Sequence, residues 1–277
     1  MYYEDSLLFI YLKGLIQGFP YSNLIEEIVI DEAQDYNIFQ FSILKELFNE
    51  STFSIYGDLA QSINGSGTIK SFDEVNSLVF NNNVEMLKLN KSYRTTIEIT
   101  ENANRILRKL NYIPATPVIR HGSNVKYIDD NRIDTKLKII NNWLKQGYKT
   151  IAIICKTTKE AQNMYKKLQL LNIPSNLISD NIEKYEGGIF VITSRQAKGL
   201  EFDCSIVSDV SSKVYDSNNY EDLHLLYVAL TRALHEQVII YKKDLTSVLK
   251  KDNQDVKRSN KVYSKRLVKN NKKQYEC

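Results

Sequence analysis

Short apolar runs alternate with helical stretches along most of this sequence, and the alternation constrains its fold more than any other feature. Each run is about as long as one β-strand, and the runs cover residues 27–30, 53–56, 84–89, 149–155, 188–193, 204–207 and 237–241. Helical stretches cover residues 5–17, 39–48, 96–109, 136–146, 159–170 and 220–234. Because strands and helices that alternate in this way pack as a parallel sheet with helices on both faces, the sequence predicts an α/β fold.

The length of the apolar runs argues against a membrane protein. The chain has 277 residues, enough to bury a large core in one or two domains. None of its apolar runs approaches the roughly 20 residues that cross a bilayer. The N-terminal sequence Met-Tyr-Tyr-Glu-Asp carries acids where a secretory signal carries bases. We therefore expect no membrane partner and a cytoplasmic location.

The cysteines argue against a disulfide framework and against a thiolate metal site. The three cysteines, Cys155, Cys204 and Cys277, are widely separated and form no C-x-x-C pair. Cys155 and Cys204 lie in apolar runs, so we expect both to be buried as small hydrophobic residues. The three histidines also lack the spacing that is typical of metal ligands.

Basic residues concentrate at the C-terminal end of the chain. The whole sequence has 37 basic and 33 acidic residues and a net charge of +4. Residues 256–277 hold eight of the bases and one acid, so this end carries +7 and the remainder carries −3. Because the end is also poor in apolar residues, we expect a basic flexible tail over residues 251–277. Two interpretations stay open: a solvated end with no partner, or a contact with nucleic acid or an acidic protein through residues such as Lys257, Arg258, Lys265 and Arg266.

An apolar strand that ends in carboxylates marks the first candidate site. The run that begins at Ile28 is followed directly by Asp31 and Glu32, and then by Gln34 and Asp35. In open α/β sheets, ligands bind at the carboxyl ends of the strands. Two carboxylates at that edge suit a nucleotide-hydrolysing site, in which one holds Mg²⁺ and the next polarises the attacking water. The alternative, a loop with surface acids, does not require an apolar β-branched run before the acids.

Four further motifs follow in a fixed order. They are Gly57-Asp-Leu-Ala-Gln61, Leu89-Asn-Lys-Ser-Tyr-Arg94, Thr193-Ser-Arg-Gln-Ala-Lys-Gly-Leu-Glu201 and Leu226-Tyr-Val-Ala-Leu-Thr-Arg232. Together with the carboxylate motif, the series resembles motifs II to VI of the superfamily 1 helicases of the UvrD/Rep type. The resemblance covers about residues 24–241.

The resemblance implies a P-loop-NTPase (RecA-like) fold, which is a parallel sheet flanked by helices. Under this interpretation residues 1–90 are the C-terminal portion of the first motor domain, 1A. Residues 91–250 are the complete second motor domain, 2A, and residues 251–277 are the basic tail.

The resemblance also implies a role for each matching residue. ATP and Mg²⁺ are the expected ligands, with Asp31 and Glu32 as metal candidates and Glu32 as the general base. The other nucleotide contacts would be Gln61, Arg94 and Arg232 at the γ-phosphate, Tyr93 at the adenine, Glu201 at the ribose, and Asp58 and Gly199 nearby. Two arginines directed at a transferring phosphoryl group would stabilise its developing charge. Arg195 and Lys198 are weaker candidates for contact with nucleic acid.

Residues 26–40 look most like the HelD branch of this family, whose members work with bacterial RNA polymerase and use ATP to help release or recycle it. The stretch from Leu110 to Gly188 is too short for the large insertion that UvrD and Rep carry in their second motor domain. The resemblance therefore implies the C-terminal part of an ATP-driven DNA helicase or translocase, with nucleic acid and RNA polymerase as expected partners. The alternative is a non-catalytic module that binds RNA polymerase or nucleic acid.

Three departures from the family pattern bear on this interpretation. The phosphate-binding loop G-x-x-x-x-G-K-[ST] occurs nowhere in the sequence, so we expect a fragment or truncated product that needs a separate P-loop segment and is inactive alone. Asn64 and Gly65 stand where the DNA helicases place an aromatic residue that stacks on bases. Arg195 stands where those helicases commonly have histidine, and both differences argue against strand separation.

Deletion of the tail tests its electrostatic interpretation. We expect a chain that ends at Asp255 to bind DNA more weakly than the full chain and with a flatter dependence on salt, by about 0.9 in the logarithmic slope for each lost phosphate contact. A salt titration of DNA binding by both chains measures this. Equal affinities and equal slopes would assign the binding to the folded part of the chain.

Overall fold

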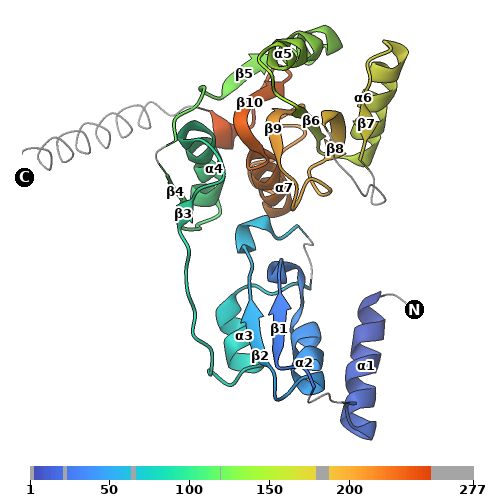
Figure 1. Ribbon diagram of the computed structural model, residues 1–277, viewed down its shortest axis with the longest axis vertical. Coiled ribbons are helices and arrows are strands. Elements are labelled where there is room, and N and C mark those ends of the chain that lie inside the picture. The colour runs from blue at the N-terminus through green and yellow to red at the C-terminus, as the bar shows by residue number, and fades with distance from the viewer. Residues whose placement is uncertain (1–2, 21–23, 64–66, 119, 179–186, 251–277) are drawn as a thin grey trace, which may run out of the picture.

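The computed structural model shows two units joined by an extended connector (Figure 1). The N-terminal unit spans residues 3–83, the connector spans residues 84–90, and the C-terminal unit spans residues 91–250. The structure describes residues 3–20, 24–63, 67–118, 120–178 and 187–250. The basic tail with Lys257, Arg258, Lys265 and Arg266 lies outside the described residues, as does Asn64, so the expectations for them stay predictions.

The C-terminal unit is built on six parallel strands in the order β5-β10-β9-β6-β8-β7. Their bounds are β5 Lys126–Asp129, β6 Thr150–Cys155, β7 Asn176–Leu177, β8 Gly188–Thr193, β9 Phe202–Val207 and β10 Ala233–Tyr241. In the centre of the sheet, Ile151 of β6 lies opposite both Ile189 of β8 and Cys204 of β9. These strands are almost continuously apolar because helices cover both of their faces.

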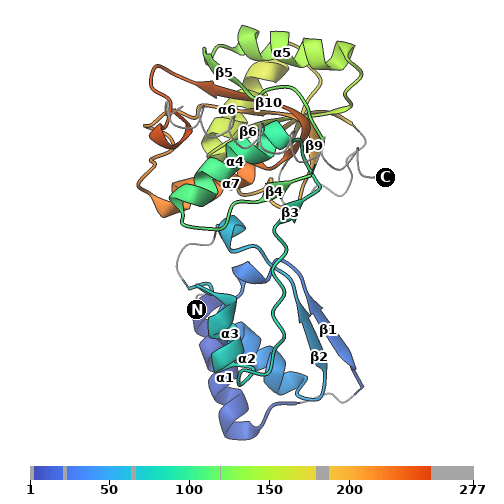
Figure 2. The ribbon, with the colours of Figure 1, turned by 90° about the vertical axis from the view of Figure 1, so that its left-hand side faces the viewer.

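Four helices form the two outer layers of this sheet (Figure 2). Helices α4 (Ile97–Lys109) and α7 (Tyr220–Leu230) cover one face, and α5 (Ile133–Lys145) and α6 (Thr158–Leu170) cover the other. Successive side chains of a strand point to opposite faces. Ile154 of β6 therefore packs with α4 and α7, whereas Ile153 packs with α5 and α6. A short 3₁₀ helix, η3 (Ser247–Leu249), adds Leu249 to the first layer.

The N-terminal unit has a smaller core around two parallel strands. Its elements are α1 Tyr3–Gln17, β1 Glu27–Ile30, η1 Ala33–Asp35, α2 Ile38–Leu47, β2 Thr52–Ile55, η2 Leu59–Gln61 and α3 Phe72–Leu78. Ile30, Phe41 and Val75 are buried between the sheet and helices α2 and α3. The other face of the sheet is open, since Val29 in β1 is 63% exposed.

The expected α/β class with a parallel sheet and helices on both faces is confirmed, and Cys155 and Cys204 are buried. Two expectations were wrong. Residues 84–89 form no strand, and the chain pairs only just beyond them, where β3 (Lys91–Ser92) meets β4 (Thr116–Pro117). The last helix ends at Leu230 rather than at 234, because Ala233 already pairs with Phe202 in the sheet.

The sequence patterns also did not predict α3 or the short strands β5 and β7, because these segments are too brief to show a period. Helix α1 ends at Gln17 as expected and begins two residues earlier, at Tyr3, but its apolar side chains are largely exposed, at 55% for Leu12 and 62% for Leu15. In the described part of the chain, no helix is long and apolar enough to cross a membrane.

A fully buried lysine sits under the carboxyl edge of the six-stranded sheet. Nζ of Lys136, in α5, donates hydrogen bonds to the backbone carbonyl of Asn131 at 3.1 Å and to the carbonyl oxygen of its side chain. Burial lowers the pKa of Lys136 to about 8, although Cys155 and Asp209 nearby favour its charged form. The unfolded chain binds this proton up to a pKa of about 10.4.

Stability should therefore depend on pH through Lys136. The pKa is depressed in the folded state, so the unfolded chain binds more protons between about pH 8 and 10, and the free energy of unfolding contributed by this group rises across that window. We expect the difference in unfolding free energy between the native chain and Lys136→Met to shift in favour of the native chain from about pH 7 to 9.5. Urea unfolding at several pH values measures it, with the exposed Lys138→Met on the same helix as control. A difference that stays constant with pH would contradict the assignment.

Candidate functional site

The carboxylate motif forms a tight turn at the end of β1. The backbone of Glu32 adopts a left-handed conformation with φ 51°. This conformation is uncommon for residues other than glycine, and residues that adopt it are often found at functional sites. The backbone N–H of Glu32 donates to Oδ1 of Asp31 at 2.8 Å. The turn therefore places the two carboxylates at the carboxyl edge of the small sheet, with Asp31 exposed to solvent.

Gln34 ties this turn to the end of β2. Its side chain is fully buried, with Nε2 donating to Oε2 of Glu32 at 2.5 Å and Oε1 accepting from the backbone N–H of Asp58 at 2.9 Å. A Cβ atom on Gly57 would lie 2.7 Å from Oε1 of Gln34 and 2.7 Å from the ring of Phe72. Gly57 is thus required by close packing, and Gln34 has a positioning function that its sequence position alone did not reveal.

The turn after β2 presents Gln61 to the C-terminal unit. Asp58 caps η2, accepting from the backbone N–H of Ala60 at 3.0 Å and from Nε2 of Gln61 at 2.8 Å. The amide oxygen of the same Gln61 side chain, Oε1, accepts from Nη2 of Arg232 at 2.9 Å. One glutamine side chain therefore joins a carboxylate of the N-terminal unit to an arginine of the C-terminal unit.

Arg232 is almost completely buried, at 1% exposure, between the end of α7 and the start of β10. Its guanidinium also donates to the carbonyl of Val228 at 3.0 Å, to the carbonyl of Leu200 at 3.4 Å and to Oγ1 of Thr231 at 2.8 Å. Burial, and then the neighbouring charge of Arg94, lower the pKa of Arg232 to about 10. The side chain therefore stays a cation at neutral pH.

Lys198 brings a second cation from the C-terminal unit to the carboxylate turn. Its Nζ lies 2.6 Å from Oδ2 of Asp35 and 3.2 Å from Oε2 of Glu32, and its side chain is only 9% exposed. It is carried by the turn after β8, in which Gly199 has φ +77°. The other carboxylate oxygen of Asp35 is buried and has no hydrogen-bond partner among the described residues. Lys198 therefore compensates the charge of a poorly solvated carboxylate.

The remaining candidates lie on the exposed side of the same junction. Nε of Arg94 contacts Oε1 of Glu201 at 2.6 Å, with both side chains at least 40% exposed. Tyr93 is 70% exposed. Arg232 is close enough to Arg94 and Glu201 for both charges to affect its pKa. Five sequence candidates, Glu32, Gln61, Arg94, Glu201 and Arg232, thus surround one region between the units.

Arg195, the other nucleic-acid candidate, lies away from this group. Its guanidinium pairs with Glu221 at 3.1 Å, and the two side chains are 48% and 52% exposed. A solvent-exposed pair of this kind is worth at most about 1 kcal/mol. Arg195 is therefore accessible to a ligand, whereas Lys198 is engaged with the carboxylate turn.

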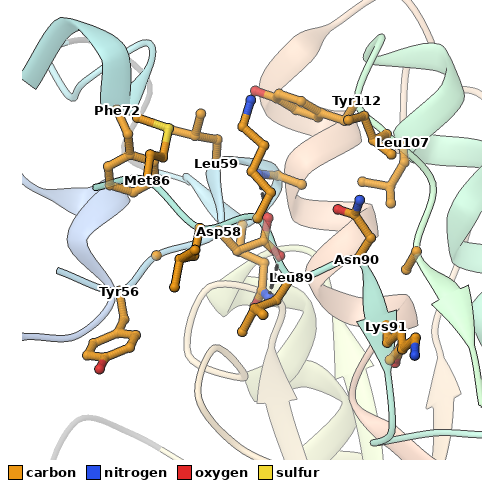
Figure 3. A pocket seen from close by; sticks show the side chains of 18 of the residues that line it. Tyr56, Asp58, Leu59, Phe72, Met86, Leu89, Asn90, Lys91, Leu107 and Tyr112 are labelled. Atoms are coloured by element: carbon orange, nitrogen blue, oxygen red, sulfur yellow. Dashed lines mark hydrogen bonds between the residues drawn. The ribbon is translucent and has the colours of Figure 1, made fainter. Parts of the chain in front are cut away.

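A cavity of about 800 Å³ borders the junction on the connector side (Figure 3). Asp58, Gln61, Tyr93, Arg94 and Thr231 form part of its wall, together with residues of the connector and of α3 and α4. Most of the remaining wall is apolar. The cavity is therefore adjacent to the polar cluster and distinct in chemistry from the carboxylate turn.

The carboxylate turn fits a Mg²⁺ ion of the kind that phosphate-transfer sites hold. Among the described residues, no group of three or more His, Cys, Asp and Glu side chains could hold a metal ion by itself. Mg²⁺ does not require such a group, since it keeps several waters and binds through one or two carboxylates and the substrate phosphates. Asp31, exposed at the strand end, suits that role.

Two family models match the chain. The UvrD/REP helicase N-terminal domain matches residues 19–66, and the UvrD-like helicase C-terminal domain matches residues 188–240. The first match contains the carboxylate turn, and the second contains Lys198, Glu201 and Arg232. Both units are therefore similar to domains of UvrD-like helicases. The matches do not assign the HelD branch, which stays a prediction.

Individual relatives are similar over parts of the chain. A component of an ATP-dependent helicase/nuclease from Oenococcus oeni is 30% identical over 135 residues, which is 48% of this chain and 10% of the relative. A putative ATP-dependent DNA helicase from Acanthamoeba polyphaga mimivirus is 27% identical over 246 residues, 78% of this chain and 34% of the relative. The chain thus spans about a third or less of these relatives. A solved C-terminal domain of a possible DNA helicase from Lactobacillus plantarum is 28% identical, with a TM-score of 0.47, over 57% of this chain and 92% of that one.

Removal of the Lys198 charge should weaken the junction. Lys198→Met keeps the length of the side chain but leaves Asp35 uncompensated, so we expect a loss of about 1 to 3 kcal/mol in unfolding free energy. Urea denaturation measures this, and Lys159→Met on the exposed surface of α6 is the control. In an Asp35→Asn background the same lysine substitution should cost clearly less. Additive effects of the two substitutions would show that the pair does not couple.

Proposed function

We propose that this chain forms part of the ATP-hydrolysing site of a UvrD/Rep-type DNA helicase or translocase, between its two units. The observation that carries the proposal is the hydrogen bond from Arg232 to Gln61, which brings a buried cation of the C-terminal unit to the edge that holds the carboxylate turn. In this assignment residues 1–90 are the end of motor domain 1A, residues 91–250 are motor domain 2A, and residues 251–277 are the tail. The family matches in both units support the assignment.

Glu32 is the proposed general base. Its carboxylate is held from two sides, by the amide of Gln34 and the ammonium of Lys198, so its orientation is defined before any ligand binds. A positioned base that accepts a proton from the attacking water contributes to the transition state rather than to binding. A Mg²⁺ ion at Asp31 would supply charge for the β- and γ-phosphate oxygens.

Arg94, Arg232 and Gln61 are the proposed γ-phosphate contacts. Arg232 is already desolvated and fixed by four acceptors, so little reorganisation is needed when a phosphoryl group approaches. Arg94 is exposed and paired with Glu201, and it is free to exchange this partner for phosphate oxygens. Two arginines around a transferring phosphoryl group stabilise the charge that develops on it.

Tyr93 and Glu201 are the proposed contacts to the nucleoside. The exposed ring of Tyr93 is available for stacking on adenine, and the carboxylate of Glu201 accepts hydrogen bonds of the type that ribose hydroxyls donate. Asp58 and Gly199, which the sequence placed near the nucleotide, act in this proposal by positioning Gln61 and Lys198. ATP would therefore lie across the junction.

Hydrolysis also needs a phosphate-binding loop, which this sequence does not contain. The proposal therefore includes a P-loop segment from outside these 277 residues as a partner, and nucleic acid as the ligand of the assembled motor. A role of the HelD type in recycling RNA polymerase is the finer form of the proposal. The alternative, a non-catalytic module that binds RNA polymerase or nucleic acid, does not require the coordinated Glu32, Gln61 and Arg232 set.

Reconstitution of the site tests this function. We expect the chain alone to release phosphate from ATP at background rate, and a fusion that carries the P-loop segment of a UvrD-like helicase ahead of Met1 to hydrolyse ATP. In that fusion, Glu32→Gln should lower kcat by about 10² to 10⁴ and leave nucleotide affinity nearly unchanged. Steady-state phosphate release measures both effects.

The matched control is Glu101→Gln, which removes a carboxylate on α4 that pairs with Arg108 away from the junction. This variant should keep full kcat. A fusion that binds ATP but whose turnover is the same with Glu32 and with Gln at that position would favour the non-catalytic alternative.

A further inference from the structure

Helices α5 and α6 carry the same pattern of polar side chains. In α5 the pattern is Lys138-Ile-Ile-Asn-Asn-Trp-Leu-Lys145, and in α6 it is Lys159-Glu-Ala-Gln-Asn-Met-Tyr-Lys166. Each segment begins and ends with lysine and has two adjacent amide side chains in the middle. The two helices therefore place equivalent groups at equivalent positions.

The fold points both sets of side chains away from the sheet. Ile140 and Trp143 of α5 are buried against the face of the six-stranded sheet that α5 and α6 cover. Ala161 and Met164 of α6 are buried on the same face, at the same positions of the pattern. With 3.6 residues per turn, the two lysines of each helix lie on the side opposite these buried residues, about 10.5 Å apart along the helix axis. All four lysines and all four amide residues are exposed.

These eight side chains, which we call the α5–α6 face, have no partners within the described part of the chain. None of them makes a hydrogen bond or an ion pair with another described residue. The acids of the two helices, Asp134 and Glu160, both lie in the first turn. Oε2 of Glu160 accepts from the backbone N–H of Thr157 as part of the helix cap. Beyond the first turn, both helices carry only basic charges.

Positive charge is concentrated in this layer of the C-terminal unit. Helices α5 and α6 contain six lysines and two acids, a net charge of +4, and only Lys136 among these lysines is buried. Helices α4 and α7 in the opposite layer contain three bases and four acids, a net charge of −1. Residues 1–255 as a whole carry −3. The α5–α6 face is therefore basic although the chain around it is acidic, which suits a polyanionic partner.

We infer that the α5–α6 face binds the phosphate backbone of a nucleic acid duplex. Lysine binds phosphate as a point charge, and the amides of asparagine and glutamine donate hydrogen bonds to phosphate oxygens. Sites for single strands add aromatic side chains on which bases stack. The face has none, because Trp143, the aromatic residue between the α5 lysines, is buried. The contact is therefore with a duplex and independent of its sequence.

This site is separate from the junction between the units. Helix α7, which leads to Arg232, covers the other face of the sheet (Figure 2). The inference goes beyond the proposed function, since it rests on charge and spacing and not on ATP hydrolysis. Loss of duplex binding and loss of phosphate release are separate outcomes of separate experiments.

Two double variants of the full chain test the site. One combines Lys138→Gln with Lys145→Gln on α5, and the other combines Lys159→Gln with Lys166→Gln on α6. We expect each to weaken binding of a fluorescein-labelled duplex of about 20 base pairs at least about fivefold at about 0.1 M salt, and to lower the logarithmic salt slope by about 1 to 2. Fluorescence anisotropy over a range of NaCl concentrations measures both. The basic tail is the same in all variants, so its contribution does not affect the comparison.

The matched control removes the same charge elsewhere. It combines Lys13→Gln on α1 with Lys109→Gln on α4, and both lysines are exposed. We expect this control to change duplex affinity less than about twofold, because its lysines do not contact the phosphates. Circular dichroism verifies that the variants are folded. Equal losses in the control and in the two double variants would show that net charge alone governs binding and would overturn the site.

Two other ligands decide what the face binds. They are an oligothymidine of about 20 nucleotides, which presents a phosphate backbone without a duplex, and polyglutamate of similar length, which presents the charge of an acidic protein surface. We expect the double variants to weaken binding of the duplex more than binding of either probe. An equal loss with oligothymidine would overturn the preference for a duplex, and an equal loss with polyglutamate would indicate an acidic protein as the partner instead.

Photocrosslinking locates the contact on the molecule. Asn142→Cys in a Cys277→Ser background provides one reactive thiol for benzophenone maleimide, since Cys155 and Cys204 are buried. We expect a crosslink to the duplex from this position, and much less from Glu101→Cys on α4 in the opposite layer. Duplex binding without a crosslink at position 142 would refute the proposal.

Discussion

The buried guanidinium of Arg232 is the constraint on which the junction depends. An arginine cannot lose its charge at neutral pH, so once it is removed from water its donors need acceptors. Three acceptors come from its own unit, at Val228, Leu200 and Thr231, and the fourth is the amide oxygen of Gln61 in the N-terminal unit. Hydrogen bonds to charged groups are worth about 1.5 to 3 kcal/mol each, which makes this contact a specific link between the units.

Charged side chains of opposite sign from the two units meet near Arg232. The C-terminal unit contributes the cations Arg232 and Lys198, and the N-terminal unit contributes the carboxylates of Glu32 and Asp35. Lys198 binds both acids, whereas Arg232 meets only uncharged acceptors. One cation of the junction is therefore paired with carboxylates, and the other makes no ion pair among the described residues, although the nearby carboxylates of Glu32 and Glu201 favour its charged form. That asymmetry suits the proposed function, in which an anionic ligand reaches Arg232 and the proposed base Glu32 is held in place by Lys198.

The two units differ in how completely helices cover their sheets. The C-terminal unit has six parallel strands with both faces covered, and its central residues, such as Ile151 and Ile153, are fully buried. The N-terminal unit has a sheet of two described strands with an open face at Val29, and an extended connector follows it. The rule that parallel strands are buried on both faces describes the first unit, whereas the face of the second sheet that carries Val29 is uncovered in the described part of the chain.

The sequence by itself determined the α/β class, most element positions and the residues of the carboxylate turn, because these depend on local period and on the order of motifs along the chain. It failed at 84–89, where a strand-like sequence has no strand partner among the described residues, and at the end of α7, where sheet pairing at Ala233 overrides helix propensity. Only the tertiary structure decided that Gln34 joins the ends of β1 and β2, that Lys198 faces Asp35 rather than solvent, and that Arg232 meets Gln61. These contacts join residues far apart in the chain or depend on burial, and neither distance in space nor desolvation is encoded in a local pattern.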